Sequence, residues 1–488
     1  MSIAKKRSNN KWIHAIISVV MIFGFGFLPP VAPLTPLGMR LLGIFLGVVY
    51  AYSTCEIIWP SLLGIVAFGL SGFYPSLAAG IGKMMGSSLV FQIITQYFTT
   101  GAIVYYGVSK WIVAKTLSRK IFKGRPLFYT WCFMVTSMWL CLVLETIPMF
   151  LLLYGIWNDI ADNCNYKKDD MFRYYGFGAI LIALIMGVSM VPYQSWQLGL
   201  ATSWANVTGS KINLGVMLLC TAIIGMSVLS AYIFLGAKLF KIDFAPMAEY
   251  DMEKLGADNV KLRPRAKRII LVYLITVSLA LFSSTFPNNV VAQFIDGKLT
   301  LAGLFCLCTA LLLVLPGGEG DGKPAIVFNE VKKSDAVVSW PVIFMCALTI
   351  PLATAMTSEE TGILQMMDTL FSPVLAGRSP VFIMIVTILV VMVLTNMTSN
   401  IAVGNAMIPI ISPFVLAQDV NPMLFGCALV YTANIGIFLP GASAPASIFH
   451  GRNEIPDAKK RTKVLSFALL LYTVMTCLVF SVAQTISG

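Results

Sequence analysis

One stretch of the chain carries polar side chains where its surroundings are almost wholly apolar. It runs from Thr395 to Pro413 and reads TNMTSNIAVGNAMIPIISP, with three asparagines and a glycine between two hydrophobic runs. An amide without a hydrogen-bond partner in hydrocarbon costs several kcal/mol, so these side chains must face protein, water or a ligand. Hydroxyl and amide oxygens at Thr395, Thr398, Ser399 and Asn400 are of the kind that bind a cation or a polar solute.

A second candidate is a single carboxylate in the apolar segment 127–157. Glu145 is the only ionisable residue there, and Thr146 and Pro148 follow it. A lone carboxylate at membrane depth is expensive and therefore indicates function. It could carry a proton or balance the charge of a cation or of an ammonium-bearing substrate; the structural alternative is a protonated carboxyl group hydrogen-bonded within the fold.

Each polar site is followed by a segment that should interrupt a helix. Residues 187–195 include Pro192 and Gln194, and Pro192 follows Glu145 by 47 residues. Residues 440–445 read PGASAP, and Ser443 follows Asn400 by 43 residues. Proline lacks a backbone donor and clashes with the preceding turn, so both segments are expected to be kinked or unwound. Similar spacing in the two halves fits an inverted repeat whose hairpins enter from opposite faces and whose helix ends meet near the membrane midplane.

The elements that position these sites are transmembrane helices. Of the 488 residues 58% are hydrophobic and 11% charged, which predicts an all-α polytopic membrane protein. About eleven apolar runs are long enough to cross a bilayer. They lie near 12–28, 41–53, 57–73, 89–109, 174–192, 212–237, 269–286, 299–315, 340–356, 423–450 and 464–485. The interrupted segments 127–157 and 380–417 are expected to be re-entrant hairpins.

The net charge of +12 is read as a topology signal, not as a nucleic-acid surface. With a cytoplasmic N-terminus and an extracytoplasmic C-terminus, all but five of the 34 Lys and Arg face the cytoplasm. The ten cysteines form no CxxC pair, and His14 and His450 are isolated, so no cofactor is expected. The expected partners are the lipid bilayer and a small-molecule substrate.

These residues resemble the divalent anion:sodium symporter family. Glu56 to Pro60 is similar to the family's acidic, Pro-containing helix start, and Ser399-Asn400-Ile401 resembles its Ser-Asn-Thr hairpin tip. Thr395 stands where the family has a sodium-binding hydroxyl, and Phe438 to Gly451 resembles the second helix break, with Ser443 in place of a threonine. The first half departs from the pattern, because Leu144-Glu145-Thr146 replaces the first Ser-Asn-Thr.

The resemblance implies an elevator-type carrier. Residues 1–125 and 268–372 would form a scaffold that also makes a homodimer contact. Residues 126–240 and 373–488 would form the moving transport part, and 241–267 a cytoplasmic linker. Na⁺ would be bound by Thr395, Ser399, Asn400 and the carbonyls of Pro440 and Ala442. The substrate would be contacted by Glu145, Thr146, Pro192, Gln194, Thr398, Ser399, Asn400 and Ser443.

The sequence therefore predicts a secondary active transporter of a small di- or tricarboxylate-like anion, coupled to Na⁺, H⁺ or both. Two alternatives use the same fold: an uncoupled exchanger or channel, and a proton-coupled carrier of a zwitterionic or cationic solute with Glu145 as counter-charge. An integral-membrane enzyme would need HExxH, paired aspartates or a Ser/His pair at one depth, and the sequence contains no such constellation.

Overall fold

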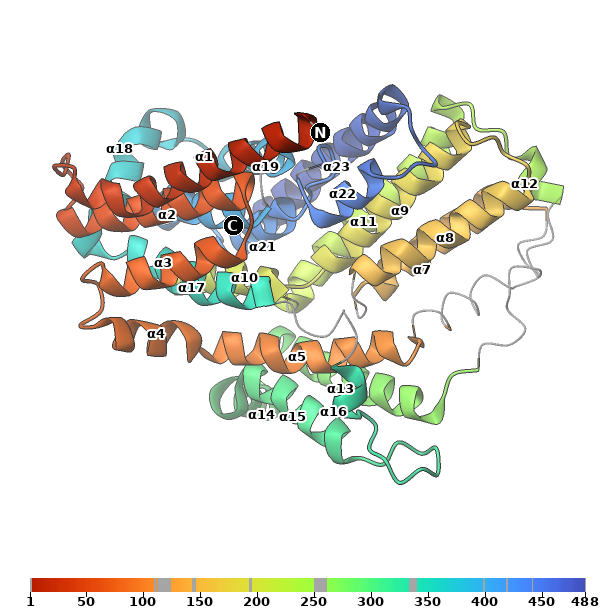
Figure 1. The fold of residues 1–488 in the computed structure, drawn as a ribbon, viewed down its shortest axis with the longest axis horizontal. Coiled ribbons are helices and arrows are strands. Elements are labelled where there is room, and N and C mark those ends of the chain that lie inside the picture. The colour runs from red at the N-terminus through yellow and green to blue at the C-terminus, as the bar shows by residue number, and fades with distance from the viewer. Residues whose placement is uncertain are drawn as a thin grey trace.

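The structure, a computed structural model, is a bundle of helices (Figure 1). It describes residues 2–108, 111, 124–142, 146–192, 195–249, 261–332, 340–397, 400–417, 420–440 and 442–487. Within these ranges there is no strand, and the only β-type pairing is an isolated bridge between Pro316 and Pro324. This confirms the all-α prediction for the described residues.

The first half of the chain contributes the elements up to residue 249. They are α1 (Ser2–Gly24), η1 (Phe25–Phe27), α2 (Pro36–Thr54), α3 (Ile58–Leu70), α4 (Leu77–Met85), α5 (Ser88–Tyr105), α7 (Pro126–Leu140), α8 (Thr146–Asn163), α9 (Met171–Ser189), α10 (Ser195–Thr208), α11 (Leu214–Leu239) and α12 (Ala245–Glu249).

The second half begins at residue 264. Its elements are α13 (Pro264–Thr285), α14 (Val290–Phe294), η5 (Ile295–Leu299), α15 (Thr300–Val314), α16 (Phe328–Val331), α17 (Trp340–Met356), η6 (Glu359–Thr361), α18 (Ile363–Leu375), α19 (Pro380–Met397), α20 (Asn400–Leu416), α21 (Pro422–Ala433), α22 (Ala444–His450) and α23 (Ala458–Ser487).

Six of the described helices are long and apolar enough to cross a membrane, or seven if α4 and α5, bent by 45°, form one span. The protein is thus a multi-pass membrane protein, while the number of eleven crossings stays a prediction. Three helices of nine or more residues were not anticipated: α4, α10 and α18. α10 follows the expected first break, whereas α4 and α18 are short helices with one apolar face.

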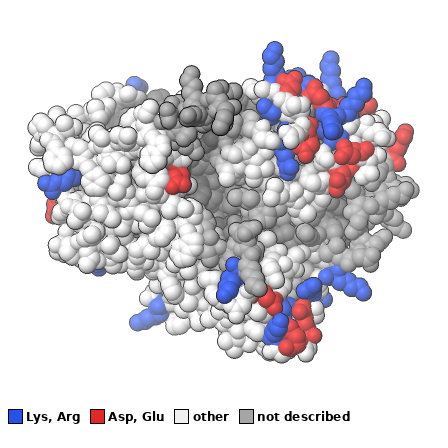
Figure 2. Space-filling model, in the orientation of Figure 1, with Lys and Arg blue, Asp and Glu red and all other residues white. Residues whose placement is uncertain are grey.

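The two predicted hairpins are present as helix pairs that extend in opposite directions. In Figure 1, α7 and α8 extend toward the right-hand end of the molecule, and α18, which leads into α19, lies at the left-hand end. α20 packs against both α18 and α19. The charged residues on this face gather toward the right-hand end (Figure 2).

The apolar interior is divided into two clusters. One contains side chains of α1–α5, α17 and the start of α18, for example Phe68, Leu348 and Ile363. The other contains α7–α9, α11, α13, α15, α19–α21 and α23, with Trp157 and Tyr232 fully buried. α10 lies between them, because its Leu198 joins the first cluster and its Leu200 and Trp204 join the second.

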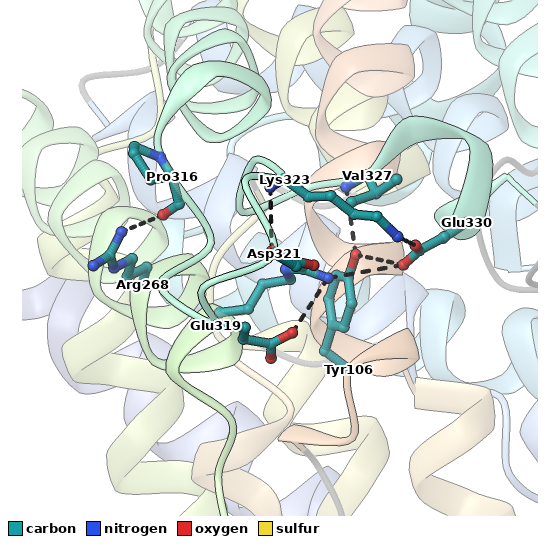
Figure 3. Close-up of polar contacts among 9 residues, drawn as sticks. Tyr106, Arg268, Pro316, Glu319, Asp321, Lys323, Val327 and Glu330 are labelled. Atoms are coloured by element: carbon teal, nitrogen blue, oxygen red, sulfur yellow. Dashed lines mark hydrogen bonds and ion pairs between the residues drawn. The ribbon is translucent and has the colours of Figure 1, made fainter.

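A charge cluster holds the loop 316–332 against the start of α13 and the end of α5 (Figure 3). Arg265, at the start of α13 and only 3% exposed, lies 2.7 Å from Asp321, 3.5 Å from Glu319 and 3.9 Å from Glu330. Its guanidinium also lies 5.5 Å from the centre of the Tyr106 ring. The hydrogen bond from Arg265 keeps the pKa of the Asp321 carboxyl below its usual range.

Candidate functional site

The candidate site is a junction where the second hairpin meets an interruption between α21 and α22. α21 ends at Ala433 and α22 begins at Ala444, so the interruption covers Asn434–Ser443. The helix is therefore interrupted, as the prediction of a break at 440–445 requires, but the predicted start of the break is wrong. α21 ends six residues earlier than the predicted break at Pro440 requires, because the backbone groups at its C-terminal end form hydrogen bonds with side chains of α19.

Asn396, near the end of α19, replaces the missing helical hydrogen bonds of the interruption. Its Oδ1 accepts from the backbone N–H of Ile437 and of Phe438, both at 2.9 Å. Its Nδ2 donates to the carbonyls of Ile435 and Met392, both at 2.8 Å. Three of these four hydrogen bonds from one amide, 5% exposed, satisfy unwound backbone that would otherwise be unpaired at membrane depth, and the fourth goes to Met392 in α19 itself.

Thr395 and Asn400 gather oxygens beside this unwound backbone. The Thr395 hydroxyl lies 2.6 Å from the carbonyl oxygen of Ala433 and 2.8 Å from Asn400 Oδ1. The Nδ2 of Asn400 donates to the Asn434 carbonyl at 3.2 Å. A hydroxyl has one hydrogen, so it can donate to only one of its two neighbours. The three oxygens therefore share a single proton.

Gly436 lets a further oxygen approach. A Cβ added at Gly436 would lie 2.3 Å from Asn400 Oδ1 and 2.9 Å from the carbonyl oxygen of Ala442. The Cβ of any other residue at this position would collide with both oxygens. Glycine is therefore required for the two oxygens to lie this close to the backbone. Thr395, Asn400 and Ala442, three of the predicted Na⁺ ligands, are thus grouped around one place.

The first half of the chain reaches the same junction. A Cβ on Gly187 would lie 2.1 Å from the carbonyl oxygen of Met138, so the end of α7 packs directly on the end of α9. Asn434 Nδ2 then donates to Ser189 Oγ at 2.5 Å, which links the two helix interruptions across 245 residues of sequence. The two helix interruptions therefore meet in the described residues, whereas residues 143–145 and 398–399 at the predicted hairpin tips lie outside them.

The remaining predicted site residues have different positions. Pro192 is buried in the first interruption, and Thr146 is the half-buried first residue of α8. The Ser443 hydroxyl donates to the Gly436 carbonyl at 2.6 Å and accepts from the Ala446 N–H at 3.1 Å, so it closes the interruption and caps α22. The carbonyl of Pro440 accepts from Ser447. Glu145, Gln194, Thr398 and Ser399 lie outside the described residues.

The chemistry of the junction follows from its helix ends. α9, α19 and α21 end there and leave backbone carbonyls that attract cations, whereas α10 and α20 begin there and present N–H groups that attract anions. Within the described part of the chain no three His, Cys, Asp or Glu side chains are placed to hold a metal ion. Neutral hydroxyl, amide and carbonyl oxygens of this kind are the ligand set of a weakly bound monovalent cation.

The family model described as the sodium:sulfate symporter transmembrane region matches residues 179–484. The chain belongs to this family. The match includes α10, α19–α22 and the whole second interruption, and it confirms the resemblance to divalent anion:sodium symporters. The family and the relatives are transporters, not enzymes.

Among curated relatives, the sodium-dependent dicarboxylate transporter SdcS of Staphylococcus saprophyticus is 24% identical over 234 residues. That match covers 47% of this chain and 42% of the relative, so less than half of the relative's length is matched. SdcS of Staphylococcus aureus is 26% identical over 167 residues, 34% of this chain and 30% of the relative.

Two solved structures share the fold. MtrF of Neisseria gonorrhoeae, described as illuminating a class of antimetabolite efflux pumps, has a TM-score of 0.59 at 11% identity and covers 98% of this chain and 95% of its own. The YdaH transporter of Alcanivorax borkumensis has a TM-score of 0.54 at 12% identity and covers 92% and 97%. At such identities the likeness concerns the fold alone.

Four residues of the junction were not predicted as site residues: Ser189, Asn396, Asn434 and Gly436. Asn396 belongs to the polar stretch that first indicated a site, and its burial with four hydrogen bonds explains one of the three asparagines there. Asn434 and Gly436 interrupt an apolar run in the sequence, and that pair is the signal that would have located the true start of the break.

Proposed function

We propose that the protein is a secondary active transporter that couples uptake of a small di- or tricarboxylate-like anion to a Na⁺ gradient. The observation that carries this proposal is the oxygen cluster of Thr395, Asn400, Ala433 and Ala442, which has more acceptor atoms than hydrogens to share. A bound cation would satisfy the acceptor oxygens for which no hydrogen is available, because it binds several oxygens at once.

The anion would bind next to the cation. The N-termini of α10 and α20 point their positive ends at the junction, and a bound Na⁺ adds a full positive charge there. Cation binding would then raise the affinity for the carboxylate, which is the physical basis of symport. Asn400 and Ser443, with Thr398 and Ser399 at the hairpin tip, would contact the substrate from one side, and Thr146, Pro192 and Gln194 from the other.

The proposed mechanism is an elevator. Residues 126–240 and 373–488 would move as the transport part against the scaffold 1–125 and 268–372, with 241–267 as the linker. Support comes from the apolar cluster that joins α1–α5 and α17, against which α10 packs; α13 and α15 of the proposed scaffold share the second cluster with the transport helices. The scaffold would form the homodimer contact, with the N-terminus cytoplasmic and the C-terminus extracytoplasmic.

The test is uptake of labelled di- and tricarboxylates into proteoliposomes holding the full chain. We expect accumulation with an inward Na⁺ gradient and none when K⁺ replaces Na⁺, and Asn400→Ala should lower it at least tenfold. Equilibration without accumulation under every ion gradient would contradict coupling and favour an exchanger or channel.

A further inference from the structure

Gln197 is a buried side chain of the first half that the function described above does not use. It lies in the first turn of α10 and is 2% exposed, and its Oε1 has no hydrogen-bond partner among the described residues. A buried amide oxygen without a partner destabilises the folded state, and in a membrane protein water does not readily remove that cost. Such an oxygen indicates a missing donor or cation.

The direction of Gln197 follows from its neighbours on α10. Residues 197, 200 and 204 lie on one face of a helix because they are three and four residues apart. A Cβ on Gly404 of α20 would lie 2.6 Å from Leu200 Cδ2. Trp204 Nε1 donates to the Pro422 carbonyl of α21 at 3.0 Å. The Gln197 face of α10 is therefore the one that packs on α20 and α21.

The depth of Gln197 follows from the same contacts. Leu200 lies at the same depth as Gly404. A Cβ added at Gly404 would also lie 3.4 Å from Ala433, at the end of α21. Trp204 is level with the beginning of α21, so α10 and α21 run in opposite directions. Three residues back from Leu200, a rise of about 4.5 Å, brings Gln197 toward Ala433 and Asn434 and to the level of Asn400.

A second unpaired oxygen lies at this depth. Thr432 is fully buried beside Ala433, and its Oγ1 has no partner among the described residues. The hydroxyl does not bond to the carbonyl one turn before it, which is the usual arrangement for a helical threonine. Unpaired buried oxygens thus come from both halves of the chain, the amide oxygen of Gln197 from α10 and the hydroxyl oxygen of Thr432 from α21.

We propose that Gln197 Oε1 is a ligand of the coupling Na⁺, contributed by the first half of the repeat to the oxygen cluster of the second half. A carboxylate substrate would be repelled by these acceptor oxygens, whereas a cation satisfies them together. This inference rests on the proposed Na⁺-coupled function. It also gives the first half a role in cation binding although its Ser-Asn-Thr motif is absent.

The experiment measures thermal stabilisation of the purified full chain as NaCl is titrated at constant ionic strength with choline chloride. Gln197→Leu removes the oxygen, and Gln197→Glu keeps an acceptor oxygen in place. Gln484→Leu is the matched control, because Gln484 is 3% exposed and also has an unpaired Oε1, but lies near the far end of α23.

We expect the Na⁺ concentration for half-maximal stabilisation to rise at least tenfold in Gln197→Leu. It should stay within about threefold of the wild type in Gln197→Glu and be unchanged in Gln484→Leu. An unchanged Na⁺ midpoint in Gln197→Leu overturns the proposal, whatever the change in its stability without Na⁺. If Gln197→Leu does not fold, a Gln197→Glu variant that loses its Na⁺ response overturns it.

Two further outcomes separate this inference from the proposed function. If the wild type responds to Na⁺ and Gln197→Leu responds equally, only the role of Gln197 is wrong. If the wild type shows no response to Na⁺ and accumulates no anion with it, the proposed coupling itself fails.

Discussion

At the scale of single residues, some side chains of the junction hold its unwound backbone in place, and others are positioned to bind a ligand. Asn396 uses both ends of its amide on the backbone of the interruption, whereas Asn400 Oδ1 shares one hydrogen with its neighbours. Two asparagines four residues apart in the same polar stretch therefore have different roles. The first holds the unwound segment, and the second faces the grouped oxygens.

This difference predicts different phenotypes. Asn396→Ala leaves the N–H groups of Ile437 and Phe438 without an acceptor and should destabilise the protein by roughly 2–4 kcal/mol with or without Na⁺. Asn400→Ala should change stability less but abolish the Na⁺-dependent stabilisation. Thermal unfolding at zero and saturating Na⁺ measures both, and equal effects of the two variants would contradict the assignment.

Glu145 remains a proposal carried by the sequence. It lies outside the described residues, between the end of α7 at Leu140 and the start of α8 at Thr146. If it carries a proton or balances a cation, uptake by Glu145→Gln should lose its pH dependence, because glutamine cannot ionise. Uptake measured from pH 5.5 to 8.5 tests this, and full, pH-responsive transport by the variant would show that Glu145 has no such role.

At the scale of elements, the loop 316–332 is held by charge as well as by the fully buried apolar side chains of Ala325, Ile326 and Val331. Lys323 Nζ lies 3.0 Å from Glu330, and its hydrogen bond lowers the pKa of that carboxyl. Glu330 also accepts from Tyr106 at 3.4 Å, which connects the loop to the end of α5. In Figure 3 the side chains of Glu330 and Tyr106 point toward one another. The loop therefore ties α5, α13 and α15 together at one end of the molecule.

Arg265→Met should release this loop. The change leaves Glu319, Asp321 and Glu330 without the guanidinium between them, so amide hydrogen exchange in 316–332 should become at least tenfold faster at pH 7. The exposed Arg263, two residues earlier, supplies the control variant Arg263→Met. Equal exchange in wild type and Arg265→Met would mean that the backbone holds the loop without the ion pairs.

The same cluster has a pH dependence with a defined sign. The folded-state pKa values of Asp321 and Glu330 are lowered, so their contribution is complete above the unfolded values, about 4, and is lost as the pH falls through the lowered values. Exchange in 316–332, corrected for the intrinsic rate, should be constant between pH 7 and 5 and rise below about pH 4. A rise between pH 7 and 5 would contradict this cause.

At the scale of the whole molecule, the contact between α10 and α17 is where the proposed transport part meets the scaffold. A Cβ on Gly199 would lie 3.1 Å from Ile350, so the two helices approach closely. Asn206 Nδ2 donates to Thr354 Oγ1 at 3.4 Å across the same contact. In an elevator these residues must separate when the transport part moves.

Cross-linking tests that motion. In a background with the ten native cysteines replaced, Asn206→Cys together with Thr354→Cys should form a mercury-bridged pair and lose transport, with recovery after thiol treatment. Each single variant is the control, because mercury has no second thiol to bridge there. Wild-type transport by the cross-linked double variant would exclude relative movement of α10 and α17.

The sequence by itself determined the membrane environment, the two polar sites and their repeat spacing, because hydropathy and the cost of unpaired polar groups are local properties. It also predicted Thr395 and Asn400 as site residues, and the structure brings their oxygens together. Only the tertiary structure decided that the second interruption begins at Asn434 and that Ser189 meets it. These results depend on partners 38 to 245 residues apart, which packing brings together and no local pattern specifies.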